Sequence, residues 1–165
     1  MSTGILLIRL GLAAMLCGHA SQKLFGWFRG GGPKNTAKVF ESWGFRPGVP
    51  MVLMASACEV TAAGLLALGL ATPLAGAVLI GTMIVAASPN FAKGPWAHLG
   101  GYEVPLIYGS LGFILTWSGP GTVSLDHVIG IEAAGPGWAF AALAVGIVTA
   151  LPPLRSRQRN LARAS

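Results

Sequence analysis

Five stretches of apolar residues divide the chain, and each is bounded by glycine, proline or charged residues. They cover residues 5–28, 51–70, 74–87, 101–117 and 138–154. About 20 apolar residues in a helix cross the core of a bilayer, so the first four stretches predict four core transmembrane helices. The fifth has about 17 residues and ends in Pro152-Pro153, at the short limit for spanning. We interpret it as a fifth crossing, and the predicted fold is an all-α, polytopic membrane helix bundle.

A short polar segment separates the first two stretches. Residues 30–33 (GGGP) predict a break after the first helix. Residues 35–43 (NTAKVFESW) follow, with Asn35 as a candidate N-cap and Gly44 as a stop signal. They suit an amphipathic helix lying on the membrane surface or a plain loop, and the sequence favours neither.

Composition supports a membrane protein, and it affects how the positive net charge is interpreted. Hydrophobic residues make up 53% of the 165 residues and charged ones only 10%, with a mean hydropathy of +0.67. A soluble domain needs far more charge on its surface. The net charge of +6 does not indicate nucleic acid, because the basic residues flank apolar stretches in the manner of the positive-inside rule.

The placement of charge predicts an orientation. Basic residues gather in residues 23–46, at Lys93 and in the arginine-rich end of the chain, which five crossings place on one side. The other side receives the uncharged turn at residues 72–73 and an acidic loop with Asp126 and Glu132. Basic loops stay in the cytoplasm, so we expect the N-terminus outside and the C-terminus inside. The apolar start lacks a small-x-small cleavage site, so we expect it to remain a membrane helix.

Four ionisable residues are predicted at a similar depth near the cytoplasmic side. At 1.5 Å of rise per residue, His19 lies roughly 8 Å and Glu59 roughly 12 Å from that boundary, with Lys23 and Glu103 close to its edge. Ionisable residues inside a membrane are costly and often functional. His19, Lys23, Glu59 and Glu103 therefore form a candidate polar cluster, with Lys23 and Glu59 as an ion pair. The alternative is that such pairs only fix the order and register of the helices.

Two further pairs are weaker candidates. Arg9 lies in the opposite leaflet, where Asp126 is the nearest acidic residue. Cys17 and Cys58 are both predicted roughly 10 Å from the cytoplasmic boundary, which permits a redox dithiol. Without a CxxC spacing we favour cysteine as a small packing residue. The sequence has no metal-ligand spacing, phosphate loop or dinucleotide motif, and no cofactor is evident from the residues alone.

Several of these residues lie in segments that resemble the DoxX family of small prokaryotic membrane proteins. Residues 18–28 (GHASQKLFGWF) resemble the family's GHGxQKLFGWF stretch, with Ala20 where a glycine is usual. Glu59 followed by residues 64–70 (GLLALGL) resembles its E-x(4)-G-L-L-L-x-G-L helix. Residues 101–103 (GYE) and 119–126 (GPGTVSLD) complete the resemblance.

The resemblance divides the chain into three parts. Residues 1–127 form a DoxX-like membrane bundle, residues 128–154 an additional apolar segment, and residues 155–165 a basic cytoplasmic tail. The family commonly ends near residue 127 of this chain, with four crossings. The location that follows is a prokaryotic plasma membrane.

The resemblance also implies a function. Members are often described as membrane partners of oxidoreductases, and the family takes its name from a subunit associated with a thiosulfate:quinone oxidoreductase. We therefore expect a membrane subunit of a quinone-linked redox complex, with quinone as the implied cofactor and oxidoreductase subunits as partners. Proton handling by Glu59 or Glu103 is the one chemical step that the residues suggest, and electron transfer would need a partner. A membrane scaffold without catalysis and a small proton-coupled transporter are the alternatives, and a homo-oligomer is compatible with each.

Overall fold

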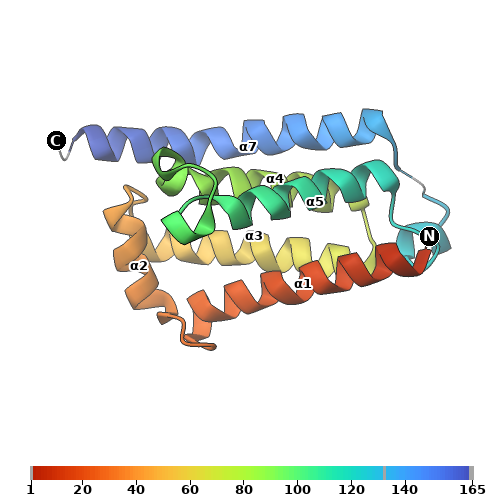
Figure 1. Ribbon diagram of the computed structural model, residues 1–165, viewed down its shortest axis with the longest axis horizontal. Helices are drawn as coiled ribbons and strands as arrows, with labels where there is room; N and C mark the ends of the chain where they lie inside the picture. The colour runs from red at the N-terminus through yellow and green to blue at the C-terminus, as the bar shows by residue number, and fades with distance from the viewer. Residues whose placement is uncertain (1, 132, 164–165) are drawn as a thin grey trace.

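The computed structural model describes residues 2–131 and 133–163, and every regular element in them is helical. Five long helices follow one axis and alternate in direction (Figure 1). They are α1 (Ser2–Phe25), α3 (Gly48–Leu68), α4 (Thr72–Ala87), α5 (Glu103–Ser118) and α7 (Pro136–Ala162). The shorter α2 (Gly32–Ser42) crosses one end of the bundle, where the 3-10 helices η1 (Ser88–Lys93) and η2 (Ala97–Leu99) also lie. The short α6 (Leu125–Val128) lies at the other end, near the N-terminus.

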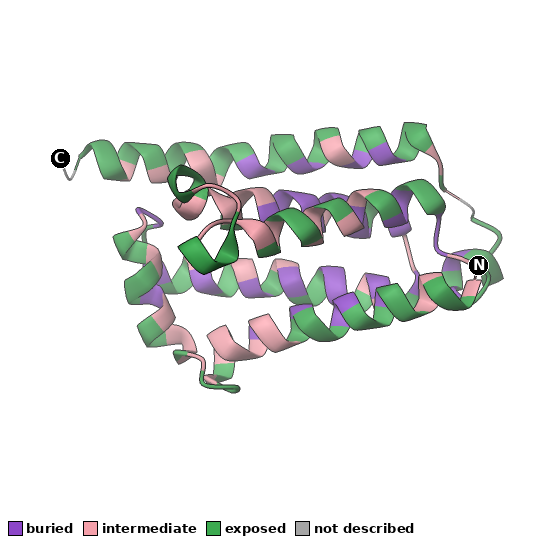
Figure 2. Ribbon diagram, viewed as in Figure 1, coloured by how far each residue is buried: buried purple, intermediate pink, exposed green. Residues whose placement is uncertain are grey.

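The predicted fold class, a polytopic helix bundle, is confirmed. Four segments of the described chain are long and apolar enough to cross a membrane: α1, α3, α4 with η1, and α7. α5 has 16 residues, or about 24 Å of helix, and lies beside α4 (Figure 1). Large apolar side chains such as Leu7, Met15 and Val148 are exposed on the outer faces of the helices. Figure 2 shows this pattern, with buried positions turned inward, as expected for a bundle surrounded by lipid.

The ends of the bundle differ in charge, in agreement with the charge pattern of the sequence. The α2 end carries the basic segment 23–46, Lys93 and the arginines of α7 (Figure 1). The opposite end carries Asp126 and the turn between α3 and α4. Glu132, expected in the same acidic loop, lies outside the described residues. Which end faces the cytoplasm stays a prediction.

Several helices begin or end a few residues from their predicted bounds, and the differences at α2 and α7 have a clear cause. α2 is a helix, which resolves the open alternative, but it begins at Gly32 rather than after Asn35. Pro33 lies in its first turn, where no backbone N–H is needed, so this proline starts the helix. α7 continues past Pro152 and Pro153 to Ala162, so residues 155–162 of the expected tail are helical.

The far end of α7 docks on the loop between α2 and α3, which explains why the helix continues. Arg157 Nε donates to the Trp43 carbonyl at 2.8 Å, and Asn160 Nδ2 donates to the Gly44 carbonyl at 2.9 Å. The Arg157 guanidinium also lies 5.8 Å from the centre of the Phe45 ring. These contacts hold the last turns of α7 against the base of α2.

α4 is the central helix and contacts α3, α5 and α7. Two glycines permit its close approaches: a Cβ at Gly76 would collide with the Thr116 hydroxyl of α5, and one at Gly81 would lie 2.9 Å from the Thr149 hydroxyl of α7. Such small residues let helix backbones pack closely in lipid. The apolar core beside α4 brings α1, α3 and α5 together through Leu16, Leu66 and Leu115.

Candidate functional site

An ion pair joins α1 to α3 near the α2 end of the bundle. Lys23 Nζ lies 2.5 Å from each carboxylate oxygen of Glu59. Glu59 is buried, while the side chain of Lys23 keeps 19% of its surface exposed. Lys23 comes from the last turn of α1 and Glu59 from the middle of α3, and the antiparallel packing of the two helices places them at one depth. The pair is neutral as a whole, which makes its burial tolerable.

A polar pocket of about 440 Å³ opens on one side of this pair. His19 Nε2 lies 3.5 Å from the Tyr108 hydroxyl of α5, and both residues line the pocket with Lys23 and Glu59. The roof is α2, which contributes Phe40 and Trp43 with stacked rings 5.8 Å apart, together with Asn35 and Thr36. The pocket thus combines a neutral ion pair, an imidazole, a phenol and two aromatic faces. We call it the polar pocket.

Sequence reasoning missed Tyr108 and the contribution of α2. Tyr108 lies inside an apolar stretch, and only the register of α5 against α1 reveals that it reaches His19. Val39, Phe40 and Trp43 are recognisable as one face of a short helix, but the sequence does not show that α2 turns back over the end of α1 (Figure 1). An isolated tyrosine in an apolar helix was the one available signal.

Glu103 does not join the polar pocket, which corrects the expectation of a four-residue cluster. Its Oε2 accepts a hydrogen bond of 2.8 Å from the backbone N–H of Ala97, in the loop that precedes α5. Glu103 is the first residue of α5, a position where a carboxylate also favours the positive end of the helix dipole. Its role is therefore to close the 97–103 loop.

Arg9 and Asp126 lie in one buried region at the other end, but they do not form the expected direct ion pair in the described structure. Arg9 is 1% exposed, and its guanidinium donates to the carbonyls of Leu66 (2.7 Å), Ala67 (3.0 Å), Pro120 (2.6 Å) and Val123 (2.9 Å). It therefore caps the carboxyl end of α3. Carbonyls at the end of a helix need partners outside the helical ladder, although the Leu66 carbonyl also accepts from the Gly69 backbone N–H at 3.1 Å.

Asp126 caps the next helix instead. Its carboxylate accepts hydrogen bonds from the backbone N–H groups of Ala71 (2.7 Å) and Thr72 (3.0 Å) and from the Thr72 hydroxyl (2.9 Å). These groups form the amino end of α4. The two charges thus hold the turn between α3 and α4 from both sides, and this arrangement is structural.

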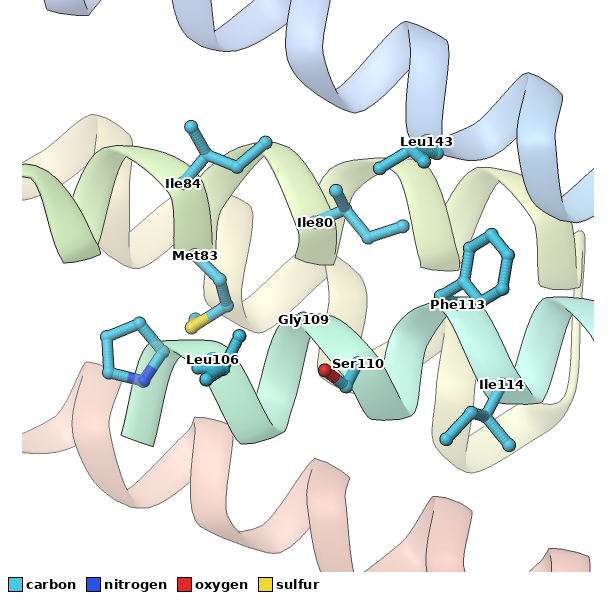
Figure 3. Close-up of a pocket in the computed structure, with 10 residues that line it drawn as sticks. Ile80, Met83, Ile84, Leu106, Gly109, Ser110, Phe113, Ile114 and Leu143 are labelled. Carbon is cyan, nitrogen blue, oxygen red and sulfur yellow. The ribbon is translucent and has the colours of Figure 1, made fainter. Parts of the chain in front are cut away.

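Two features outside the polar pocket are the free cysteines and a smaller, apolar cavity. Cys17 and Cys58 are both free thiols, Cys17 exposed on α1 and Cys58 half-buried on α3. No group of three metal-ligating side chains occurs among residues 2–131 and 133–163. A cavity of about 390 Å³ between α4, α5 and α7 is lined by apolar side chains around Ser110 (Figure 3). It suits lipid or a packing partner rather than chemistry.

The helices and the buried ion pair define a multi-pass membrane protein with a polar pocket near one end of its bundle. The DoxX family model matches residues 4–94, which is more than half of the chain. The chain therefore belongs to the DoxX family, as the resemblance of residues 18–28 predicts. Comparison with curated proteins and with solved structures gives no match.

The family match covers part of the polar pocket. It includes His19, Lys23 and Glu59 and the whole of α2, but it ends before α5 and α7. The expected DoxX-like region 1–127 is longer than the matched one. Tyr108 and the docking of Arg157 on the α2–α3 loop are therefore features of this chain outside the matched region.

Proposed function

We propose that this protein is a membrane subunit of a quinone-linked redox complex and that the polar pocket binds the quinone headgroup. The observation that carries the proposal is the neutral Lys23–Glu59 pair opening into a pocket with His19 and Tyr108. A pocket of this size, mostly apolar with a few convergent polar groups, is typical of small-molecule sites. The family's association with oxidoreductases supports the same reading.

The chemistry of the pocket suits a quinone ring. Quinone oxygens accept hydrogen bonds, and the Tyr108 hydroxyl and the His19 ring are donors at its wall, while the three N–H groups of Lys23 are taken by Glu59 and the His19 carbonyl. The ring itself is flat and apolar, and Phe40 and Trp43 offer aromatic faces beside these donors. Headgroup recognition therefore needs only side chains that already line the pocket.

Reduction of a quinone to a quinol consumes two electrons and two protons. A partner oxidoreductase subunit would supply the electrons. The residues of this chain would hold the ring and pass protons, with Glu59 and His19 as the groups able to carry them. This division of labour assigns the protein to binding and proton handling.

A scaffold without a ligand is the second candidate, and one observation favours it. Both oxygens of Glu59 are already held by Lys23, so the pair is complete without any ligand. In that case the pair fixes the register of α1 against α3, and the basic end of the bundle recruits partners.

Conservative changes in the pocket wall separate these candidates. Tyr108→Phe and His19→Gln leave the ion pair in place, and Tyr102→Phe is the matched control because Tyr102 stacks on Phe91 outside the pocket. Quinone binding is measured by quenching of tryptophan fluorescence, with thermal unfolding to verify the fold. Loss of the phenol donor should weaken the Kd of Tyr108→Phe about 2- to 13-fold and leave Tyr102→Phe unchanged, and His19→Gln, which keeps an N–H donor but loses the ring, should weaken the Kd by less. Equal binding by all three would favour the scaffold.

A further inference from the structure

A second, longer cavity begins on the other side of the ion pair. It lies between α3, α4 and α7, has a volume of about 490 Å³, and shares Lys23, Glu59, Phe40 and Trp43 with the polar pocket. Along α4 and the start of η1 it is lined from Leu74 to Pro89, which is about 22 Å of helix. We call it the long groove. It follows most of α4 and meets the polar pocket at the ion pair.

The walls of the long groove are apolar, because the hydroxyl groups that line it are already hydrogen-bonded within their own helices. Two threonines line it, but Thr82 donates its hydroxyl to the Val78 carbonyl at 2.7 Å, and Thr149 donates to the Val145 carbonyl at 2.9 Å. Both hydroxyls are thus satisfied within their own helices. The charged side chains among its lining residues are Lys23 and Glu59, on the part of the wall that it shares with the polar pocket, and Met51 and Met54 line it further toward the α2 end. The groove therefore offers apolar surface along its length and polar contacts at one place.

Resting on the proposed function, we infer that the long groove holds the polyprenyl chain of the quinone whose headgroup lies in the polar pocket. An apolar groove about 22 Å long suits a chain better than a compact ligand. The charged side chains on its wall, Lys23 and Glu59, form a neutral ion pair, which carries no net charge to bind a phosphate. The absence of net charge favours a ligand with an uncharged headgroup over a phospholipid, whose headgroup carries a phosphate.

The C-terminal part of α7 helps to build this groove. Val145, Thr149, Pro152 and Pro153 form one wall, and all lie outside the matched family region. Pro152 and Pro153 come just before the turns of α7 that dock on the α2–α3 loop. The additional apolar segment thus gains a role: it encloses a chain-binding site that α3 and α4 alone would leave open to lipid.

The test compares two quinones with the same ring, one with a long polyprenyl chain and one with a methyl group in its place. Ala55→Trp fills the long groove from α3, and Val85→Phe fills it from α4. Ala57→Trp is the matched control, because Ala57 is exposed and does not line the groove. Binding to the full chain in detergent is measured by isothermal titration calorimetry. We expect wild type to bind the long-chain quinone at least about tenfold more tightly, because its chain is buried.

Ala55→Trp and Val85→Phe should remove that preference and leave the affinity for the short quinone unchanged, while Ala57→Trp keeps both. If wild type binds both quinones equally, the headgroup site stands and the chain site is wrong. If excess phospholipid abolishes the preference for the long chain, the groove is a general lipid site and the inference fails. If the groove variants act as expected but Tyr108→Phe and His19→Gln do not, the chain site stands and the headgroup site falls. Binding of neither quinone overturns both.

Discussion

Replacing Arg9 by methionine should destabilise the protein strongly, because Arg9 satisfies four backbone carbonyls in a region that excludes water. The guanidinium is 1% exposed and binds the carbonyls of Leu66, Ala67, Pro120 and Val123 at 2.6–3.0 Å. Methionine has a similar length but no donor, so the change leaves these carbonyls without the partner that they have in wild type. It also leaves the buried carboxylate of Asp126 without its neighbouring positive charge.

The expected cost follows from these contacts. Removing one member of a buried, hydrogen-bonded charge arrangement typically costs about 3–5 kcal/mol. Arg9→Lys keeps the charge but has only three donors on one nitrogen, so it should lose about half of that, or about 2 kcal/mol. In Asp126→Asn an NH2 group replaces one carboxylate oxygen and cannot accept the hydrogen bonds that this oxygen accepts in wild type. This change should lower the free energy of unfolding by about 1–3 kcal/mol.

The assay is unfolding by sodium dodecyl sulfate in mixed micelles, followed by circular dichroism. Arg159→Met is the matched control, because Arg159 is exposed near the end of α7, and it should unfold close to wild type. Because the two caps share one turn, the double variant Arg9→Met/Asp126→Asn should lose less than the sum of the single changes. An Arg9→Met protein as stable as Arg159→Met would refute the capping role of Arg9.

Three further predictions follow from the ion pair, the helix packing and the charge pattern. Lys23→Met should lower the free energy of unfolding by about 3–5 kcal/mol, because it leaves Glu59 buried and unpaired. Lys23→Met/Glu59→Leu should recover near wild-type stability in the same unfolding assay. A double variant no more stable than the single one would contradict this. Gly76→Ala should cost about 1–3 kcal/mol by forcing α4 away from α5, while Gly64→Ala, which meets no neighbour, should be neutral; equal unfolding of the two would show that close packing is unimportant. Ser156→Cys, in a chain lacking its native cysteines, should react with an impermeant maleimide only in permeabilised cells, since basic ends stay inside; labelling of intact cells would reverse the orientation.

The fold and the ion pair were accessible from the sequence because both depend on regular helix geometry. Apolar length gives the helices, and a rise of 1.5 Å per residue brings Lys23 and Glu59 to one depth on neighbouring helices. The same arithmetic fails for Glu103, because a residue at a helix start has backbone groups of the adjoining loop within reach. Depth alone does not distinguish these two situations.

Arg9 and Asp126 show a second limit of sequence reasoning. Opposite charges in one leaflet suggest an ion pair, but Arg9 binds backbone carbonyls and Asp126 binds backbone N–H groups at two helix ends. Such groups are invisible in the pattern of side chains. Tyr108 and the long path of α7 required tertiary information, because they depend on how α5 and α7 pack.

The most direct test of the account is native mass spectrometry of the intact protein, purified in mild detergent so that lipophilic ligands are retained. We expect a quinone bound to wild type, with a lower bound fraction in Tyr108→Phe and in Lys23→Met/Glu59→Leu, each verified as folded. A wild-type particle free of quinone even when quinone is added, or a quinone retained equally by the folded variants, would contradict it.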